Sequence, residues 1–320
     1  MKTTKRILLV GTGNIAKDYA KILLSLGEPF IAVGRGESNC SKFNRVTGCE
    51  SIPGGILAYL ANHDDSFERA IVATPAETLW QVTKVVLECG ISEILLEKPG
   101  GLNRAELAAM ETMAQKMNAR IAIAYNRRFY SSVIKAAELI EADGGVKSFN
   151  FEFTEWEHIV VKANLPAKTL ANWLLCNSTH VIDLAFHLGG QPETWKAFAT
   201  RNCSWCPGYA NYGGAGISNS GASFSYQANW MAPGRWGVEW LTDHHRLILR
   251  PLEQLHIQKK VSVAVEKMEL DDDDDIRFKP GLYKQLKAFL YGEGAFRLKR
   301  LSEQVDDLAV YERIAGQTFE

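Results

Sequence analysis

The stretch that decides the fold is Ile7-Leu8-Leu9-Val10-Gly11-Thr12-Gly13-Asn14-Ile15-Ala16. Its four apolar residues suit a strand buried on both faces, and the pattern after the turn continues at helical spacing to Leu26. Gly11 allows the tight turn, Gly13 lets the backbone approach a pyrophosphate, and Ala16 permits close packing of helix on strand. We therefore predict that free N–H groups at the helix start bind a dinucleotide, with contacts from Gly11, Thr12, Gly13, Asn14 and Ile15.

The alternation of short apolar runs with helical patterns continues through the first 125 residues. Four further runs suit buried strands: Phe30–Val33, Ala70–Ala73, Glu93–Leu96 and Arg120–Ala124. Helical spacing is found between them, in Thr78–Glu88 and Arg104–Met117. This order predicts an α/β fold with a doubly wound parallel sheet of the Rossmann type over residues 1–125.

The spacing of apolar and polar residues changes near Lys147. The new pattern predicts a second α/β domain, residues 126–320, built on an open, mostly antiparallel sheet. Its expected strands are Phe149–Phe153, Ala222–Trp230, Gly237–Leu241 and Arg246–Lys260. Its expected helices are Thr179–Leu188, Gly281–Leu290 and Ser302–Ala315. The terminal helix, residues 302–315, is the element expected to pack back on the first domain. Asp271–Asp275 is expected to form a solvated loop, because adjacent like charges repel.

Composition narrows the class of protein. The 320 residues include 36 Lys and Arg against 37 Asp and Glu, so the net charge is −1 and we expect neither nucleic acid nor an anionic membrane as partner. The apolar run after the basic N-terminus is too short for a targeting signal, and no run reaches the length of about 18 residues that spans a bilayer. A cytoplasmic location is therefore expected.

The six cysteines are scattered, which favours reduced thiols over a disulfide framework. Only Cys203-Ser-Trp-Cys206 has motif spacing. A zinc site needs about four ligands and no second pair is visible, and a redox pair usually starts a helix, whereas Pro207-Gly208 follows here. We therefore interpret this spacing as coincidental and predict no metal site.

The choice of dinucleotide depends on the end of the second strand, which reads Ala32-Val33-Gly34-Arg35-Gly36. An NAD-selective protein usually has an acid there for the ribose 2′-OH. Arg35, helped by Ser38, can instead pair with a 2′-phosphate, which favours NADP over NAD. Glu37 lies close enough in sequence to reach a ribose, so NAD stays open. Thr74 and Pro75, at the end of the third strand, are expected to cover the dinucleotide.

Several short motifs then converge in one order along the chain. They are Gly11 to Ala16, Ala73-Thr74-Pro75, Glu97-Lys98-Pro99, Tyr125-Asn126-Arg127-Arg128-Phe129 and His180-Val181-Ile182-Asp183. Together they resemble the glucose–fructose oxidoreductase, inositol dehydrogenase and rhizopine catabolism family over essentially the whole chain. The resemblance implies hydride transfer between a nicotinamide and a secondary alcohol or ketone of a small-molecule sugar, cyclitol or sugar derivative, hence a role in carbohydrate metabolism. It also implies a homodimer or homotetramer associated through the open sheet face, here Ala222–Trp230.

By the same resemblance, Lys98 contacts the reacting oxygen and His180 is the general acid/base, a pair suited to moving the hydroxyl proton. Lys98 lies just past a buried strand, where open α/β sheets place ligands, and Pro99 is expected to be cis. Glu97, Lys98 and Asn126 are further expected cofactor contacts. Asp183 shares a helix face with His180 and can orient an imidazole. The expected substrate contacts are Lys98, Arg127, Trp173, Asn177, His180 and Asp183, with Lys162, Asn172, Arg235, Trp236 and Tyr209–Tyr212 as further wall residues.

Cys176 departs from the family pattern, which commonly has Asp four residues before the histidine and Gly two before it; here Cys176 and Ser178 occupy those positions. A neutral Asn177 between them cannot raise the basicity of His180 as an acid would. The departure favours a substrate that carries its own negative charge, such as an acidic or nucleotide-linked sugar. Two alternatives stay open: an NAD-dependent glycosidase that oxidises its substrate transiently, and a non-catalytic sensor that binds NADP(H).

Overall fold

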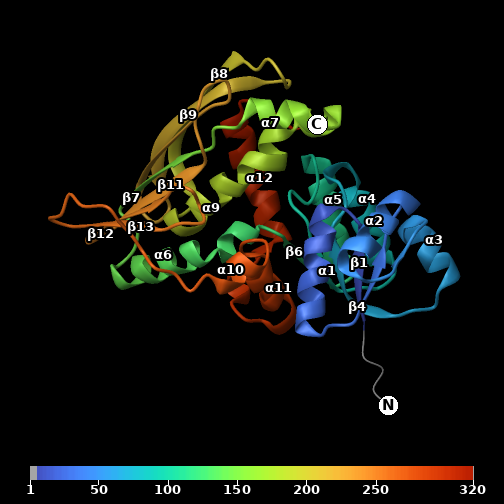
Figure 1. Ribbon diagram of the computed structural model, residues 1–320. Coiled ribbons are helices and arrows are strands. Elements are labelled where there is room, and N and C mark those ends of the chain that lie inside the picture. Colours follow the sequence, from blue (N-terminus) through green and yellow to red (C-terminus); the bar gives the residue numbers. More distant parts are fainter. Residues whose placement is uncertain (1–5, 320) are drawn as a thin grey trace. The chain divides into compact units, whose positions relative to one another are not determined.

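The computed structural model describes residues 6–319 and divides into two compact units (Figure 1). Unit 1 comprises the chain up to Tyr125 together with Leu282–Asp306. Unit 2 comprises Asn126–Gly281 and the chain from Asp307 onward. The first five residues, most of the basic N-terminal stretch, lie outside the described residues. Unit 1 is thus discontinuous in sequence. The sequence predicted that the terminal helix, residues 302–315, packs back on the first domain, whereas the segment that belongs to unit 1 begins at Leu282.

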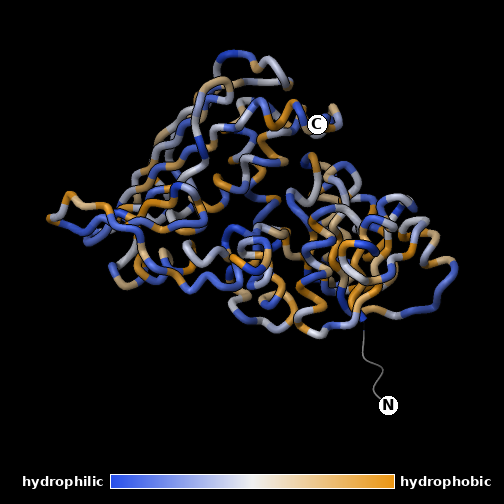
Figure 2. Tube along the Cα trace, in the orientation of Figure 1, coloured by the Kyte–Doolittle hydropathy of each residue, from blue (hydrophilic) through white to orange (hydrophobic). Residues whose placement is uncertain are grey.

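Unit 1 is built on a seven-stranded sheet in the order β15-β6-β5-β4-β1-β2-β3. The first six strands along the chain are parallel, and β15 runs antiparallel at one edge. Their bounds are β1 Arg6–Val10, β2 Phe30–Val33, β3 Ser51–Ile52, β4 Phe67–Val72, β5 Glu93–Leu96, β6 Arg120–Ile123 and β15 Lys299–Arg300. Central residues such as Leu8, Leu9 and Ile71 are fully buried, as expected where helices cover both faces. Figure 2 shows this interior as the most hydrophobic part of unit 1.

The helices of unit 1 are α1 Asn14–Leu26, α2 Glu37–Thr47, α3 Gly55–Asn62, α4 Leu79–Glu88, α5 Arg104–Lys116 and α11 Leu282–Tyr291, with short 3₁₀ turns η1 Ala76–Thr78 and η4 Ala295–Arg297. α1 ends where Gly27 adopts the left-handed conformation, a common helix stop. α11 packs against α1, and Gln285 is fully buried there. The predicted Rossmann sheet is confirmed, while α2 and α3 were not among the predicted helices.

Unit 2 is built on an eight-stranded sheet in the order β14-β13-β12-β11-β7-β10-β9-β8. Only β7 and β10 pair in parallel among its described strands. The bounds are β7 Ser148–Glu152, β8 Pro192–Asn202, β9 Tyr209–Ser218, β10 Ser223–Asn229, β11 Gly237–Leu241, β12 His245–Leu249, β13 His256–Lys259 and β14 Glu266–Lys267. The predicted α/β class with a mostly antiparallel second sheet is therefore confirmed.

The helical elements of unit 2 lie before, between and after these strands. They are η2 Asn126–Phe129, α6 Ser131–Ala142, α7 Glu157–Lys162, α8 Ala167–Ala171, η3 Leu174–Ser178, α9 Thr179–Gly189 and α10 Asp273–Arg277. The last helix, α12 Leu301–Ala315, has its first residues in unit 1 and the rest in unit 2. η3 is a π-helical turn that leads directly into α9, the kind of local widening that occurs often at functional sites.

The apolar side of β10 corrects one expectation. Phe224, Tyr226 and Ala228 are buried, and the Phe224 ring packs edge-on against Phe186 of α9 with ring centroids 5.2 Å apart. α9 therefore covers the face that was expected to serve subunit association. The opposite, exposed face of β10 is polar, with Ser223, Ser225 and Gln227.

Two local expectations were also wrong. Arg246–Lys260 is two strands, β12 and β13, because Pro251 and the turn after it interrupt the run. The acidic run is not simply a solvated loop, since α10 begins at Asp273. Asp275 explains this: its carboxylate accepts hydrogen bonds from the backbone N–H of Ser131 at 2.7 Å and of Gly281 at 2.8 Å. Carboxylates that satisfy backbone donors offset the repulsion between neighbouring charges.

Candidate functional site

A cavity of about 560 Å³ opens in unit 1 where β1, β2 and β4 end. It is lined by Val10, Gly11, Thr12, Gly13, Ile15, Val33, Arg35, Gly36, Asn39, Gly54, Gly55, Ile56, Leu57, Ala73, Thr74, Pro75, Thr78 and Val82. The carboxyl ends of parallel strands are where α/β sheets bind ligands, and the start of α1 supplies N–H groups that suit a phosphate. The cavity therefore has the position and the backbone donors of a dinucleotide site.

Gly11 and Gly13, in the turn after β1, are suited to glycine for different physical reasons. Gly11 has a φ of +125°, and a Cβ there would lie 2.3 Å from the carbonyl oxygen of Ala73, so the fold itself requires glycine. At Gly13 a Cβ would meet no protein atom within 4 Å. The space beside Gly13 is open, which leaves room for a pyrophosphate against the backbone.

The structure places most of the predicted dinucleotide contacts along this cavity. Gly11, Thr12, Gly13, Ile15, Arg35, Thr74 and Pro75 line it. Asn14 accepts a hydrogen bond from the Lys17 ammonium at 3.3 Å on α1, and Ser38 is exposed on α2 while its neighbour Asn39 lines the cavity. Asn126 belongs to unit 2 and donates to the carbonyl of Pro280 at 2.9 Å.

Sequence reasoning missed the segment Gly54–Leu57, which forms one wall of this cavity. Gly54 and Gly55 both have positive φ, so the chain turns sharply after β3 to begin α3 beside Arg35. The Gly-Gly pair was the available signal, because two adjacent glycines mark a turn that other residues rarely adopt.

Lys98 follows β5 and is half-buried, in a turn whose Lys98–Pro99 peptide bond is cis, as predicted. Both neighbours are anchored within unit 1. Tyr19 donates from its hydroxyl to Glu97 at 2.8 Å, and the Gln304 amide donates to the carbonyl of Pro99 at 3.0 Å. Burial, with the nearby Glu97 charge, holds the pKa of Tyr19 well above its usual range, so Tyr19 stays a donor. The backbone that carries Lys98 is therefore fixed on both sides.

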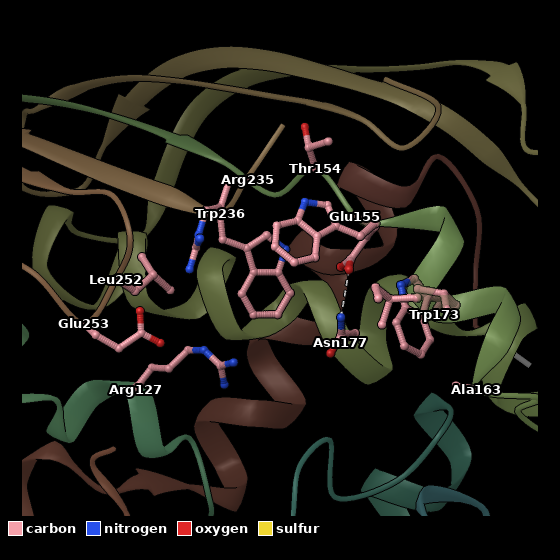
Figure 3. A pocket seen from close by; sticks show the side chains of 13 residues that line it. Arg127, Thr154, Glu155, Ala163, Trp173, Asn177, Arg235, Trp236, Leu252 and Glu253 are labelled. Atoms are coloured by element: carbon pink, nitrogen blue, oxygen red, sulfur yellow. Dashed lines mark hydrogen bonds between the residues drawn. The ribbon is translucent and has the colours of Figure 1, made fainter. Parts of the chain in front are cut away.

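A second cavity, of about 360 Å³, lies within unit 2 (Figure 3). It is lined by Arg127, Thr154, Glu155, Trp156, Ile159, Val160, Ala163, Trp173, Asn177, Arg235, Trp236, Leu252 and Glu253. Arg127, Trp173, Asn177, Arg235 and Trp236 are residues that the sequence indicated as substrate contacts or wall residues. Aromatic faces with a few charged and amide groups form the kind of lining that holds polar small molecules.

His180 lies on α9 beside this cavity and is only 7% exposed. Its ring centroid is 6.3 Å from that of Trp236, which lines the cavity. The Arg127 guanidinium lies 4.8 Å from the centroid of the same indole, within the range of a cation–π contact. Trp236 therefore contacts both the predicted general acid/base and the predicted substrate arginine.

Glu155 supplies a carboxylate that sequence reasoning missed. It is 5% exposed and follows β7 in the chain. One carboxylate oxygen accepts from the Ser178 hydroxyl at 2.6 Å, and the other accepts from the Asn177 amide at 2.9 Å. Figure 3 shows Glu155 and Asn177 pointing toward one another. No local signal could identify Glu155, since its partners are 22 and 23 residues away.

The position of Glu155 changes the interpretation of Cys176. Cys176 is 6% exposed, and the turn that carries it also carries Asn177 and Ser178, just before His180. This segment is thus contacted by a carboxylate from another part of unit 2. One N–H of the Asn177 amide donates to Glu155, and the amide oxygen is the atom that can accept a hydrogen bond from a ligand.

Asp183 is held differently from our expectation. Its two oxygens accept from the Arg128 guanidinium at 2.8 and 2.7 Å, and its side chain is 1% exposed. A buried bidentate pair ties α9 to η2 and removes this carboxylate from the surface of the cavity. The sequence predicted a substrate contact at Asp183; the structure shows its carboxylate in a buried ion pair, and the substrate contact stays a prediction.

Within residues 6–319, no group of three His, Cys, Asp or Glu side chains is placed to hold a metal ion. The helices of this described part are also too short or too polar to cross a bilayer.

Comparison with known proteins finds a family match over the first domain. Residues 5–125 match the model of an oxidoreductase family with an NAD-binding Rossmann fold, the glucose–fructose oxidoreductase, inositol dehydrogenase and rhizopine catabolism family. This match confirms the predicted family over the Rossmann domain. A curated oxidoreductase from Formosa agariphila is 25% identical over 204 residues, 59% of this chain and 61% of that protein. The matched part thus spans about three fifths of the relative.

Solved structures show the same fold over nearly the whole chain. UDP-N-acetylglucosamine 3-dehydrogenase from Acidithiobacillus ferrooxidans has a TM-score of 0.75 at 18% identity, covering 98% of this chain and 97% of that one. A levoglucosan dehydrogenase in complex with NADH and levoglucosan has a TM-score of 0.77 at 16% identity, with the same coverage of both chains.

Proposed function

We propose that this chain, whose N-terminal domain matches an NAD-binding oxidoreductase family, is an NAD(P)-dependent dehydrogenase or reductase acting on CH–OH groups. It would transfer a hydride between a nicotinamide and a secondary alcohol or ketone of a sugar, cyclitol or sugar derivative. The open space beside Gly13, at the start of α1, carries the proposal. That space adjoins the unit 1 cavity at the start of α1, where a pyrophosphate fits chemically.

Lys98 and His180 are the residues that we assign to proton transfer. A dinucleotide held along the unit 1 cavity would supply the hydride acceptor. Oxidation of the alcohol also requires a base that takes the proton from its hydroxyl oxygen. His180 is the proposed base, and the Lys98 ammonium stabilises the negative charge on the oxygen. In the reverse direction, protonated His180 returns the proton to the alkoxide.

The cavity of unit 2 supports a sugar derivative with a negative charge. Trp156, Trp173 and Trp236 offer aromatic faces, and Arg127 and Arg235 offer guanidinium groups. The same lining includes Glu253 and Glu155, and the Glu155 carboxylate accepts hydrogen bonds from Asn177 and Ser178. Arg235 is exposed and lies 5.7 Å from the Trp156 ring centroid, so its fork is held over an aromatic face. Guanidinium forks bind carboxylates and phosphates. A nucleotide-linked or acidic sugar is therefore the substrate class that we favour.

NADP is the cofactor that we favour over NAD. Arg35 is exposed at the rim of the unit 1 cavity, with Asn39 nearby in the lining. An exposed guanidinium at the end of β2 is placed to pair with a 2′-phosphate. We also propose that the protein is cytoplasmic and forms homo-oligomers. The apolar side of β10 is not the proposed subunit contact, because α9 covers it.

The first test is a fluorescence titration of the purified protein with NADPH and with NADH, repeated with Arg35→Ala and with the exposed control Arg45→Ala. Loss of a charge-assisted contact of about 1.5–3 kcal/mol should weaken NADPH binding roughly 10- to 100-fold in Arg35→Ala. NADH binding and the Arg45→Ala variant should change little. Equal loss for both cofactors would contradict the NADP preference.

The second test follows nicotinamide absorbance while UDP-N-acetylglucosamine, levoglucosan, uronic acids and inositols are added in turn. A substrate-dependent absorbance change supports the dehydrogenase. Binding of the cofactor without net turnover would favour the glycosidase or the sensor instead. Failure to bind either dinucleotide would overturn the whole proposal.

A further inference from the structure

The loop between β8 and β9 carries two cysteines that the proposed function does not use. The Sγ atoms of Cys203 and Cys206 lie 3.0 Å apart, and both are thiols. The loop is closed by a hydrogen bond from the Cys203 N–H to the carbonyl of Gly208 at 3.0 Å. The sequence alone favoured a coincidental spacing, but the folded loop brings the two sulfurs into contact.

Both cysteines lie beside a surface cavity, and Cys203 is the more exposed of the two. They line a surface cavity of about 460 Å³ together with Asn202, Pro207, Gly208, Tyr209, Gly316 and Gln317. Cys203 is half-buried and Cys206 is 7% exposed. Burial raises the pKa of the Cys206 thiol, and the neighbouring Cys203 and the Glu155 charge raise it further. Cys203 is therefore the sulfur that a reagent meets first, and Cys206 is the partner behind it.

We propose that Cys203 and Cys206 form a dithiol site that exchanges reversibly with a low-molecular-weight disulfide of the glutathione class. The Cys203 thiolate attacks one sulfur of the reagent, which forms a mixed disulfide and releases one thiol. Cys206, after losing its proton, attacks the Cys203 sulfur and releases the second thiol. The protein loses two electrons and two protons, and one disulfide reagent becomes two thiols. In a protein that lacks a disulfide framework, such a pair is typical of redox sensing.

Trp205, between the two cysteines, connects this site with the cavity of unit 2. Its ring stacks on Trp230 with centroids 5.4 Å apart and meets Trp173 edge-on at 6.2 Å. Trp173 lines the cavity. Closing the short ring from Cys203 to Cys206 constrains the backbone of Trp205, so we expect the packing of the three indoles to change on oxidation.

The test treats the full-length protein with excess glutathione disulfide and counts thiols after denaturation. Cys203 and Cys206 should both lose their free thiols, and the tryptic peptide covering residues 202–235 should become lighter by two hydrogen atoms with no glutathione attached. Dithiothreitol should reverse both changes. An unreacted pair, or a glutathione adduct that persists on the wild-type loop, would overturn the proposal.

Three variants test which cysteine attacks the reagent and which one resolves the mixed disulfide. Cys206→Ser should retain one glutathione on Cys203, and Cys203→Ser should show no change in its loop peptide. Cys89→Ser, which removes an exposed cysteine elsewhere, should still form the internal disulfide. Glutathione retained on Cys206 in Cys203→Ser would reverse the assigned order of attack.

Near-UV circular dichroism reports on the packing of the indoles. An unchanged tryptophan spectrum after oxidation would overturn the proposed link between the two cysteines and the cavity of unit 2. Because wild-type peptide mapping alone decides the disulfide, a variant that fails to fold does not weaken the test.

Discussion

At the scale of single residues, Gly11 and Gly13 illustrate two different demands on the same motif. A Cβ at Gly11 would collide with the carbonyl of Ala73, and the φ of +125° strains any other residue. A Cβ at Gly13 would collide with nothing in the protein. The first glycine is thus required for folding, and the second is required only if a ligand lies against the backbone.

Gly13→Ala should therefore fold normally but bind dinucleotide poorly. The free energy of unfolding should stay within about 1 kcal/mol, the size of a change in helix-cap preference. The Kd for NADH and NADPH should rise at least tenfold, because the methyl group occupies the pyrophosphate position. Thermal melting and fluorescence titration measure the two effects, with Gly213→Ala on β9 as the control. Unchanged affinity would mean that the pyrophosphate lies elsewhere.

The Glu155 carboxylate accepts hydrogen bonds from both Asn177 and Ser178. We therefore expect that removal of its charge changes activity. Glu155→Gln keeps the shape but removes the charge and turns one acceptor into a donor. Hydrogen bonds to charged groups contribute about 1.5–3 kcal/mol, so kcat/KM for the sugar should fall roughly 10- to 100-fold while cofactor affinity is kept.

Glu253→Gln is the matched control for Glu155→Gln, since Glu253 lines the same cavity but is exposed. It should change kcat/KM by less than about threefold, as exposed charges contribute little. Equal decreases of kcat/KM in the two variants would show that activity depends on the net charge of the cavity and not on the hydrogen bonds of Glu155.

At the scale of elements, α9 is the helix that positions the site. It begins at the π-helical turn η3, packs on β7 and β11, and is joined to η2 by the buried pair of Arg128 and Asp183. Each of these contacts lies within unit 2. The helix that carries His180 is thus fixed at its start by Glu155 and one turn later by Arg128.

Asp183→Asn should destabilise unit 2 strongly, because it leaves the buried Arg128 charge without its carboxylate. Breaking one side of a buried pair costs about 3–5 kcal/mol. Urea denaturation measures the loss, and Glu138→Gln, which removes an exposed ion pair with Lys135 on α6, should cost less than about 1 kcal/mol. A similar small loss in both variants would show that the Asp183 pair is not buried in solution.

At the scale of the whole molecule, unit 1 depends on a segment from the second half of the chain. β15 pairs with the edge of β6, and Lys299 is fully buried with its ammonium 5.0 Å from the Tyr125 ring centroid. Gln285 of α11 is buried near the Tyr19 hydroxyl. Every dinucleotide motif nevertheless lies within the first 125 residues.

A fragment of residues 6–125 should therefore lack a cooperative unfolding transition, since it exposes the β6 edge and the surface that α11 covers. The same fragment joined by a flexible linker to residues 282–306 should regain both the transition and NADH binding. Thermal circular dichroism and fluorescence titration distinguish the two fragments. Cooperative unfolding of residues 6–125 alone would show that the added segment is dispensable.

Sequence patterns were sufficient to predict the parallel sheet and the glycine turn between the first strand and the first helix. These features depend on neighbouring residues: buried runs between helical patterns, and glycines at fixed spacing after a strand. It also indicated five of the residues that line the cavity of unit 2. Local patterns carry this information because secondary structure and tight turns are set by residues a few positions apart.

Which side chains contact one another depends on the tertiary structure. Glu155 lies 22 residues from Asn177, and Arg128 lies 55 residues from Asp183. The contact between the sulfurs of Cys203 and Cys206 depends on how the loop between β8 and β9 folds. The covered face of β10 depends likewise on α9, which lies elsewhere in the chain. Hydrogen bonds and ion pairs between distant segments leave no periodicity in a sequence, because their geometry exists only once the chain has folded.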